Sequence, residues 1–208
     1  MYNKNNSCSN IIVLIWWAFQ WKSLIALKLA SKLDYSWVIS TDFIRNTLRI
    51  IDPVPEILCS TSNMDTKVFL VQRNKISDFL YKLLPFYTER QEKIILEGIH
   101  FSKDFLIYLK NNWAKCFGLN NTLTWKEKVV KKLITTPITR LNKNSGQILD
   151  YCKNKEDYNK ISYLEKEEKY IFFHKIILSE LKELNIDIIN YNDLSNAIDD
   201  ILNSLDKS

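Results

Sequence analysis

One segment near the start of the chain constrains its fold more than any other. Residues 11–15 read Ile-Ile-Val-Leu-Ile, and after a short loop Lys22-Ser23 opens an amphipathic stretch. An apolar run of this length, bounded by a loop, is typical of a buried strand, and the pattern that follows is typical of a helix. The segment therefore predicts a strand, a loop and a helix, which together begin a parallel α/β unit.

The loop in this segment matches a phosphate-binding loop except at its glycines. A P-loop has the form G-x-x-x-x-G-K-[ST], and here Trp16 and Trp21 stand at the two glycine positions. Glycine lets such a loop turn sharply and bring its backbone N–H groups against phosphate oxygens. The candidate phosphate-binding residues are Trp16, Trp17, Ala18, Phe19, Gln20, Trp21, Lys22 and Ser23.

Glycine is scarce along the whole chain. The 208 residues include 3 glycines and 6 tryptophans, where an average composition would give roughly fifteen glycines. Trp37 and Trp113 also follow predicted helices, at C′ positions where a left-handed backbone favours glycine. One hypothesis is that the gene carries UGA codons that its cell reads as glycine. Two alternatives stay open: a degenerate P-loop that has lost nucleotide binding, and a coincidence in which the tryptophans are core aromatics.

Apolar β-rich runs alternate with helical patterns, which is typical of a parallel sheet with crossover helices. Strands are expected at 11–15, 37–41, 93–97, 114–118 and 186–190. Helices are expected at 22–33, 42–50, 66–84, 103–111, 125–134, 158–184 and 193–204. The proline-broken stretch 51–65 is expected to be a substrate loop, and the polar stretch 137–157 a lid.

Length and composition favour one soluble domain. A chain of 208 residues with 46% hydrophobic content can bury one sizeable core, so residues 11–205 are expected to form it behind a disordered segment at 1–10. The net charge of +5 suits an anionic ligand but is a weak indication of nucleic acid. The four scattered cysteines indicate neither a zinc site nor a disulfide framework. No stretch is long enough to cross a membrane or typical of an export signal, so a cytoplasmic protein is expected.

Two groups of candidate catalytic residues lie in the first fifty positions. In a P-loop the Lys22 ammonium would neutralise phosphate and the Ser23 hydroxyl would coordinate Mg²⁺. Asp42 and Arg45 follow the second predicted strand, one helical turn apart, where parallel sheets gather their ligands. Asp42 could orient or deprotonate an acceptor hydroxyl and Arg45 could hold an anionic group. The alternative is Asp42 as a helix N-cap with Arg45 as its surface partner.

A third candidate is Glu97, at the end of the apolar run Ile94-Ile95-Leu96. An acid at the tip of a central strand is placed to bind Mg²⁺ directly or through water, and Gly98 permits close backbone approach there. The alternative is a polar strand end without a ligand. His100 and His174 are expected to be structural. In the predicted lid, Arg140 is the candidate for stabilising the transferring phosphoryl group, although charged runs are usually solvated faces.

The order of these motifs resembles the 2-phosphoglycerate kinase family of P-loop kinases. The resemblance rests on the P-loop pattern, on Val38-Ile39-Ser40-Thr41-Asp42-Phe43-Ile44-Arg45, on Gln72 in a helical stretch, and on Ile95-Leu96-Glu97-Gly98-Ile99-His100. It covers about residues 11–101. It implies a three-layer α/β P-loop NTPase fold of the nucleoside and shikimate kinase type, with a central parallel five-stranded sheet and a helical lid. It also implies transfer of a phosphoryl group from ATP, with Mg²⁺, to a small hydroxylated and anionic acceptor.

This sequence departs from the family in its lid, where Arg140 is the only arginine after position 90. The identity of the acceptor therefore stays open. Two other functions also stay open. The tryptophans as written suggest a pseudokinase that keeps the fold as a binding or regulatory module, and the positive charge alone suggests a kinase or binder of nucleic-acid ends.

Overall fold

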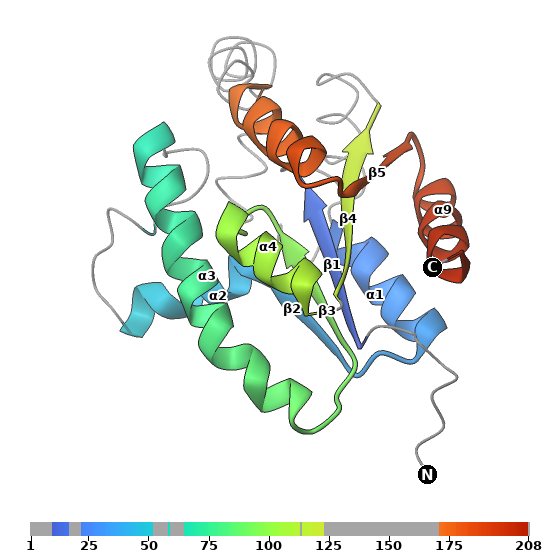
Figure 1. The fold of residues 1–208 in the computed structure, drawn as a ribbon, viewed down its shortest axis with the longest axis horizontal. Coiled ribbons are helices and arrows are strands. Elements are labelled where there is room, and N and C mark those ends of the chain that lie inside the picture. Colours follow the sequence, from blue (N-terminus) through green and yellow to red (C-terminus); the bar gives the residue numbers. More distant parts are fainter. Residues whose placement is uncertain are drawn as a thin grey trace, which may run out of the picture.

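The computed structural model of the protein describes residues 10–16, 22–51, 58, 65–112, 114–122 and 171–207. In chain order the elements are β1 (Ile11–Trp16), α1 (Lys22–Leu33), β2 (Trp37–Ser40), α2 (Thr41–Ile51), α3 (Thr66–Thr88), β3 (Ile94–Gly98), α4 (Lys103–Asn111), β4 (Lys115–Asn121), β5 (Asp187–Tyr191) and α9 (Leu194–Asp206) (Figure 1). Residues 171–183 are also helical and are called the 171–183 helix below. The predicted N-terminal segment up to residue 9, helix 125–134 and lid 137–157 lie outside these residues, as does most of the predicted substrate loop.

The five strands form one parallel sheet in the order β2-β3-β1-β4-β5. The chain leaves the central strand β1 toward β2 at one edge, and later crosses from β3 to β4 on the other side of β1. Such a reversal of strand order opens a crevice at the carboxyl ends of the strands, which is where open α/β sheets bind ligands. The predicted central parallel five-stranded sheet is confirmed.

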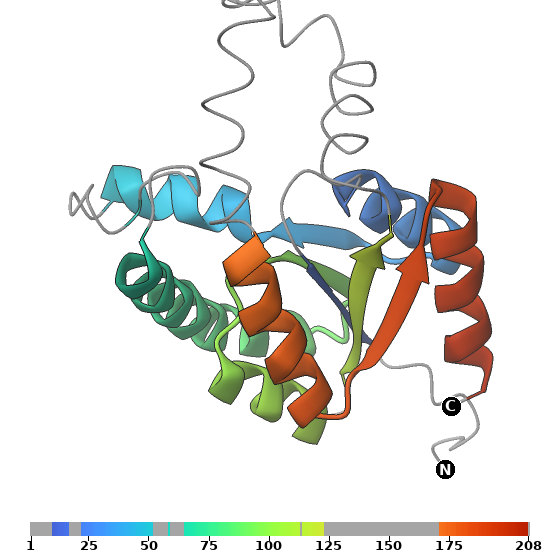
Figure 2. The ribbon, with the colours of Figure 1, turned by 90° about the horizontal axis from the view of Figure 1, so that it is seen from above.

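Helices cover both faces of the sheet and make three layers (Figure 2). Strand β1 shows why, because its alternate side chains enter two separate cores. One core contains Ile11, Val13 and Ile15 with α3, α4 and the 171–183 helix. The other contains Ile12, Leu14 and Trp16 with α1 and α9. A strand buried on both faces reads as a continuous apolar run, and this accounts for the segment that dominates the sequence.

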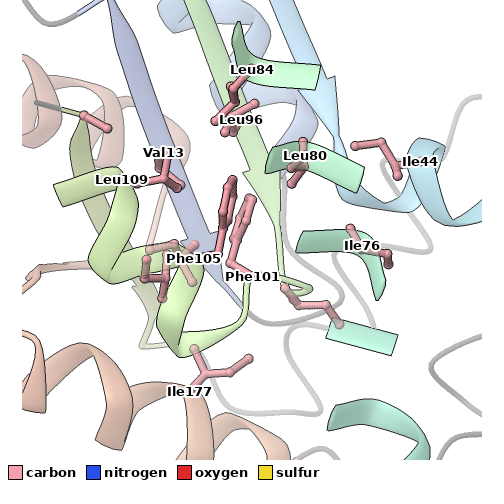
Figure 3. Packing of buried hydrophobic residues seen from close by; sticks show 14 of the residues in the cluster. Val13, Ile44, Ile76, Leu80, Leu84, Leu96, Phe101, Phe105, Leu109 and Ile177 are labelled. Atoms are coloured by element: carbon pink, nitrogen blue, oxygen red, sulfur yellow. The ribbon is translucent and has the colours of Figure 1, made fainter. Parts of the chain in front are cut away.

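The larger core is centred on two aromatic rings beside β3 and α4. Phe101 and Phe105 stack with ring centroids 6.3 Å apart, and Leu80 of α3, Val13 of β1 and Ile177 surround them (Figure 3). Both rings are essentially inaccessible to solvent. This packing holds the loop that follows β3 firmly against the rest of the domain.

Two details of the local predictions are wrong. Trp37 does not occupy a helix C′ position: α1 ends at Leu33, the left-handed residue is Asp34 with φ of 56°, and Trp37 begins β2. Aspartate tolerates this conformation better than most residues, so no glycine is required there. Helix α3 also does not stop before Pro85 but continues to Thr88. Among the described residues, no helix has both the length and the apolar character needed to span a membrane.

Candidate active site at the carboxyl edge of the sheet

Two of the predicted site residues meet at the carboxyl edge of the sheet. Ser23 lies in the first turn of α1, directly after the P-loop segment, and Glu97 lies at the end of β3. Glu97 shares a face of β3 with Ile95, which belongs to the core beneath α1. The Ser23 hydroxyl donates a hydrogen bond of 3.0 Å to Glu97 Oε1, across 74 residues of sequence. The strand tip and the helix start that the sequence indicated separately therefore form one site.

The burial of the Glu97 carboxylate fits a cation site. Glu97 is 0% exposed, whereas Ser23 faces solvent. A buried carboxylate is costly unless hydrogen bonds or a cation compensate its charge. Hydroxyl and carboxylate oxygens are ligands that Mg²⁺ accepts, and Mg²⁺ usually combines one or two of them with water and phosphate oxygens. The described residues contain no cluster of three or more His, Cys, Asp or Glu side chains placed to hold a metal ion.

The second half of the site is the start of α2. Ser40 ends β2, Thr41 begins the helix and Asp42 follows in its first turn, so Asp42 is not the N-cap that the alternative interpretation required. Arg45 Nη2 lies 3.5 Å from Asp42 Oδ1, with side-chain exposures of 12% for Arg45 and 37% for Asp42. The predicted pairing of these residues is present, but the arginine is largely buried rather than on the surface. Its Nε atom has no hydrogen-bond acceptor among the described residues.

A buried polar pair that the sequence did not indicate joins the two halves of the site. Thr41 Oγ1 lies 3.0 Å from His100 Nδ1, and both side chains are almost fully buried. Gly98 makes room for the pair. Its φ is +149°, and a Cβ atom at this position would lie 1.8 Å from Thr41 Oγ1. The signal available in the sequence was the Gly98-x-His100 spacing, but the partner Thr41 is 59 residues away.

Arg73 proves to be a structural residue rather than a ligand-binding one. It lies in α3 and is 3% exposed. Its Nε donates to the Phe101 carbonyl oxygen at 2.8 Å, and its Nη1 donates to Glu180 Oε1 at 2.9 Å. Arg73 therefore ties the loop after β3 to the 171–183 helix. The neighbouring Gln72 is also buried, and Arg49 is exposed at the end of α2.

Trp16, at the first glycine position of the P-loop pattern, is part of the core. It is the last residue of β1, is 1% exposed and stacks on Tyr191 with ring centroids 6.0 Å apart. Its backbone is not in a positive-φ conformation, so the strand itself does not call for glycine there. Within the described part of the chain, its Nε1 has no hydrogen-bond partner.

Several predicted site residues lie outside the residues that the structure describes. These are Trp17, Ala18, Phe19, Gln20, Trp21 and Arg140. Lys22 is placed only as the first residue of α1. Their roles stay predictions.

A polar pocket that the sequence did not indicate opens at the ends of β4 and β5. Its volume is about 390 Å³, and its lining is formed by Thr122, Asn190, Tyr191, Asn192, Asn196, Asp199 and Asp200. Asn120 Nδ2 donates to Asn190 Oδ1 at 2.7 Å across the two strands. Burial raises the pKa of the Tyr191 hydroxyl, against a smaller lowering by its hydrogen bond with Asn121. The pocket therefore offers neutral amides and a protonated phenol, bordered by two carboxylates.

No family model and no curated protein sequence matches the chain. Among solved structures, the chain is similar to shikimate kinase from Aquifex aeolicus vf5, with 12% identity over 95% of this chain and 96% of that one and a TM-score of 0.45. It is also similar to a gluconokinase from Sinorhizobium meliloti 1021, with 10% identity over 94% and 91% and a TM-score of 0.44. A third is dephospho-CoA kinase from Campylobacter jejuni, with 12% identity over 96% and 99% and a TM-score of 0.46. At these TM-scores the likenesses assign neither a family nor an activity, and the resemblance to the 2-phosphoglycerate kinase family stays a prediction.

Proposed function

We propose that this protein is an ATP- and Mg²⁺-dependent small-molecule kinase. The observation that carries the proposal is the hydrogen bond of 3.0 Å between Ser23 and Glu97. In P-loop kinases a hydroxyl after the P-loop lysine and an acid at a strand tip serve the same Mg²⁺ ion. Here these two residue types, predicted from separate motifs, lie together at the carboxyl edge of a parallel sheet.

The residues on the nucleotide side each have one role in this proposal. Residues 16–23 hold the β- and γ-phosphates, with the Lys22 ammonium neutralising their charge. Ser23 and Glu97 hold Mg²⁺, which when bound neutralises the charge that develops on the transferring group. Arg140 in the lid is proposed to approach the same group.

The acceptor side is proposed to lie at the start of α2. Arg45 would bind the anionic group of a small metabolite, such as 2-phosphoglycerate, because its guanidinium is largely buried and has hydrogen-bonding capacity left at Nε. The acceptor oxygen forms a bond to the γ-phosphorus while the bond from that phosphorus to the β,γ-bridging oxygen breaks. The acceptor's hydroxyl proton passes to the Asp42 carboxylate. We expect a small anionic substrate in the cytoplasm, and neither a nucleic acid nor a membrane as partner.

One observation favours a second function, a pseudokinase that acts as a binding module. Trp16 fills the core at the first glycine position and stacks on Tyr191. If tryptophan also occupies positions 17 and 21 in the cell, the loop cannot bring its N–H groups against phosphate. The two functions share a fold and differ in whether this loop can bind phosphate.

The test is a phosphoryl-transfer assay on two proteins, one as written and one with glycine at positions 16, 17 and 21. Both are given γ-labelled ATP, Mg²⁺ and a panel of phosphorylated and carboxylated hydroxy acids. The proposal predicts label transfer by the glycine protein, and a fall of at least about 100-fold in kcat for Glu97→Gln. Arg49→Gln, an exposed arginine at the far end of α2, is the control and should leave the rate unchanged. Absence of both ATP binding and label transfer in the protein as written would favour the pseudokinase, whereas tight ATP binding by the protein as written would exclude it.

A further inference from the structure

We infer that the hydrogen bond between Thr41 and His100 is a positioning contact, which sets the acceptor-binding start of α2 relative to the carboxylate of Glu97. The changes in KM that we predict from this contact rest on the proposed function. The inference adds two positioning residues, neither of which touches the reacting atoms. The orientation of α2 against the sheet does not depend on any activity and can be measured separately.

The contact joins the two halves of the site through the residues next to them. Thr41 immediately precedes Asp42 at the start of α2, and His100 lies three positions after Glu97. The strands that carry these residues are neighbours, with Ser40 in register with Glu97. The bond of 3.0 Å between Thr41 Oγ1 and His100 Nδ1 therefore ties the first turn of α2 to the segment that follows Glu97.

The histidine side of this contact is rigid. Ser77 Oγ in α3 accepts a hydrogen bond of 2.8 Å from the Ser102 backbone N–H, and Arg73 donates to the Phe101 carbonyl oxygen. The Phe69 ring of α3 lies against His100, with centroids 6.4 Å apart. The loop after β3 is thus fastened to α3, and His100 is held with it.

The threonine side has fewer supports. Only Thr41, Ile44 and Leu48 of the eleven residues in α2 are buried, while Phe43, Ile50 and Ile51 are 69% or more exposed. Ile44 and Leu48 are apolar contacts, which restrain the distance of the helix from the core more than its orientation. The hydrogen bond of Thr41 is directional, so it is the contact in the first turn best suited to fix where Asp42 and Arg45 point.

Gly98 makes the contact possible and specific. Its φ of +149° and the 1.8 Å that would separate a Cβ atom from Thr41 Oγ1 show that the threonine side chain packs directly on the backbone of β3. The arrangement places the first turn of α2 directly against the tip of β3.

The kinetic test compares Thr41→Val, which keeps the shape but removes the hydroxyl, with Thr41→Ser, which keeps the hydroxyl. The inference predicts that Thr41→Val raises the acceptor KM about tenfold, the effect of a hydrogen bond worth about 1.4 kcal/mol, and leaves the KM for ATP unchanged. Thr41→Ser should restore the acceptor KM. Equal changes in both KM values, or no rescue by serine, would overturn the inference.

A second pair of variants changes His100 instead of Thr41. His100→Asn places an amide near the position of Nδ1, and His100→Leu removes the polar group. The asparagine variant should keep a lower acceptor KM than the leucine variant. The opposite order would count against the contact, and this comparison holds even if Thr41→Val does not fold.

A spectroscopic readout separates this inference from the proposed function. The chain has two histidines, so in a His174→Gln background the imidazole ¹⁵N signals belong to His100 alone. Thr41→Val should shift the Nδ1 signal and change the residual dipolar couplings of α2 relative to the sheet, and Thr41→Ser should do neither. If the protein transfers no phosphate but α2 reorients as predicted, the proposed function fails and the positioning role stands. Unchanged α2 couplings in Thr41→Val would overturn the positioning role whatever the activity.

Discussion

Gly98 combines a backbone conformation and a close contact that other residues do not tolerate. With φ at +149° and Thr41 directly above it, Gly98→Ala would force strain and overlap together. We expect Gly98→Ala to lower the free energy of unfolding by about 3 kcal/mol, measured by urea denaturation. Gly118→Ala is the control: its Cβ would meet the end of the flexible Leu181 side chain at 2.5 Å, and Gly118 has no positive φ. Equal losses in the two variants would show that the Thr41 contact is not restrictive.

The thiol of Cys116 gives the protein an alkaline sensitivity. Burial raises its pKa from 9.0 to about 12, against a smaller lowering by Lys110. Above pH 9 the folded state therefore keeps a proton that the unfolded state loses. The contribution of this thiol to the free energy of unfolding is complete below pH 9 and declines as the pH rises toward 12. Urea denaturation between pH 8 and pH 10.5 should show a loss approaching about 1.4 kcal/mol per pH unit from this group. Cys116→Ala should flatten the slope between pH 9 and 10, and an unchanged slope would refute the assignment.

Among the secondary-structure elements, the 171–183 helix is attached by two ion pairs of very different burial. Arg73 of α3 pairs with Glu180 and is nearly inaccessible, whereas Lys103 of α4 pairs with Glu183 at the surface. Removing one partner of a buried pair leaves an uncompensated charge, which costs about 3 kcal/mol or more. Arg73→Met should therefore strongly lower the midpoint of urea denaturation, and Lys103→Met should leave it nearly unchanged. Similar midpoints for both variants would contradict the role given to Arg73.

The elements themselves were largely predictable from the sequence, because β1 and β3 are apolar runs, the other strands contain short apolar stretches, and the helices have periodic patterns. The starts of α1, α3 and α4 are those predicted. Pro85 misled the prediction, since a helix can retain a proline when the following residues still bond across it, as Glu89 N–H does to the Pro85 carbonyl oxygen. The sequence pattern around Pro85 does not show that the helix continues past this residue.

The candidate site was also predictable in part from the sequence. Ser23 and Glu97 both belong to motifs placed at the carboxyl edge of a parallel sheet, so their meeting follows from topology. The contact of Thr41 with His100 depends on the register of β2 against β3 and on the missing Cβ of Gly98. The pocket of about 390 Å³ depends on side chains from β5, from α9 and from Thr122, which follows β4. The residue pattern of a single segment specifies neither the contact of Thr41 with His100 nor this pocket.

At the scale of the whole molecule, the proposed function places the nucleotide and the acceptor on opposite sides of Glu97. The P-loop segment leads into α1 on one side, and α2 begins on the other, above the β2 edge of the sheet. A transfer of the γ-phosphoryl group across the tip of β3 needs both sides. The nucleotide side is the more decisive, because without it no group is available to transfer.

The most direct test is calorimetric titration of ATP and Mg²⁺ into the protein carrying glycine at positions 16, 17 and 21. We expect one site with a dissociation constant below about 1 mM, in the range common for enzyme substrates, and much weaker binding when Ser23→Ala or Glu97→Gln is added. A folded glycine protein that binds no ATP with Mg²⁺ would contradict the proposed kinase function.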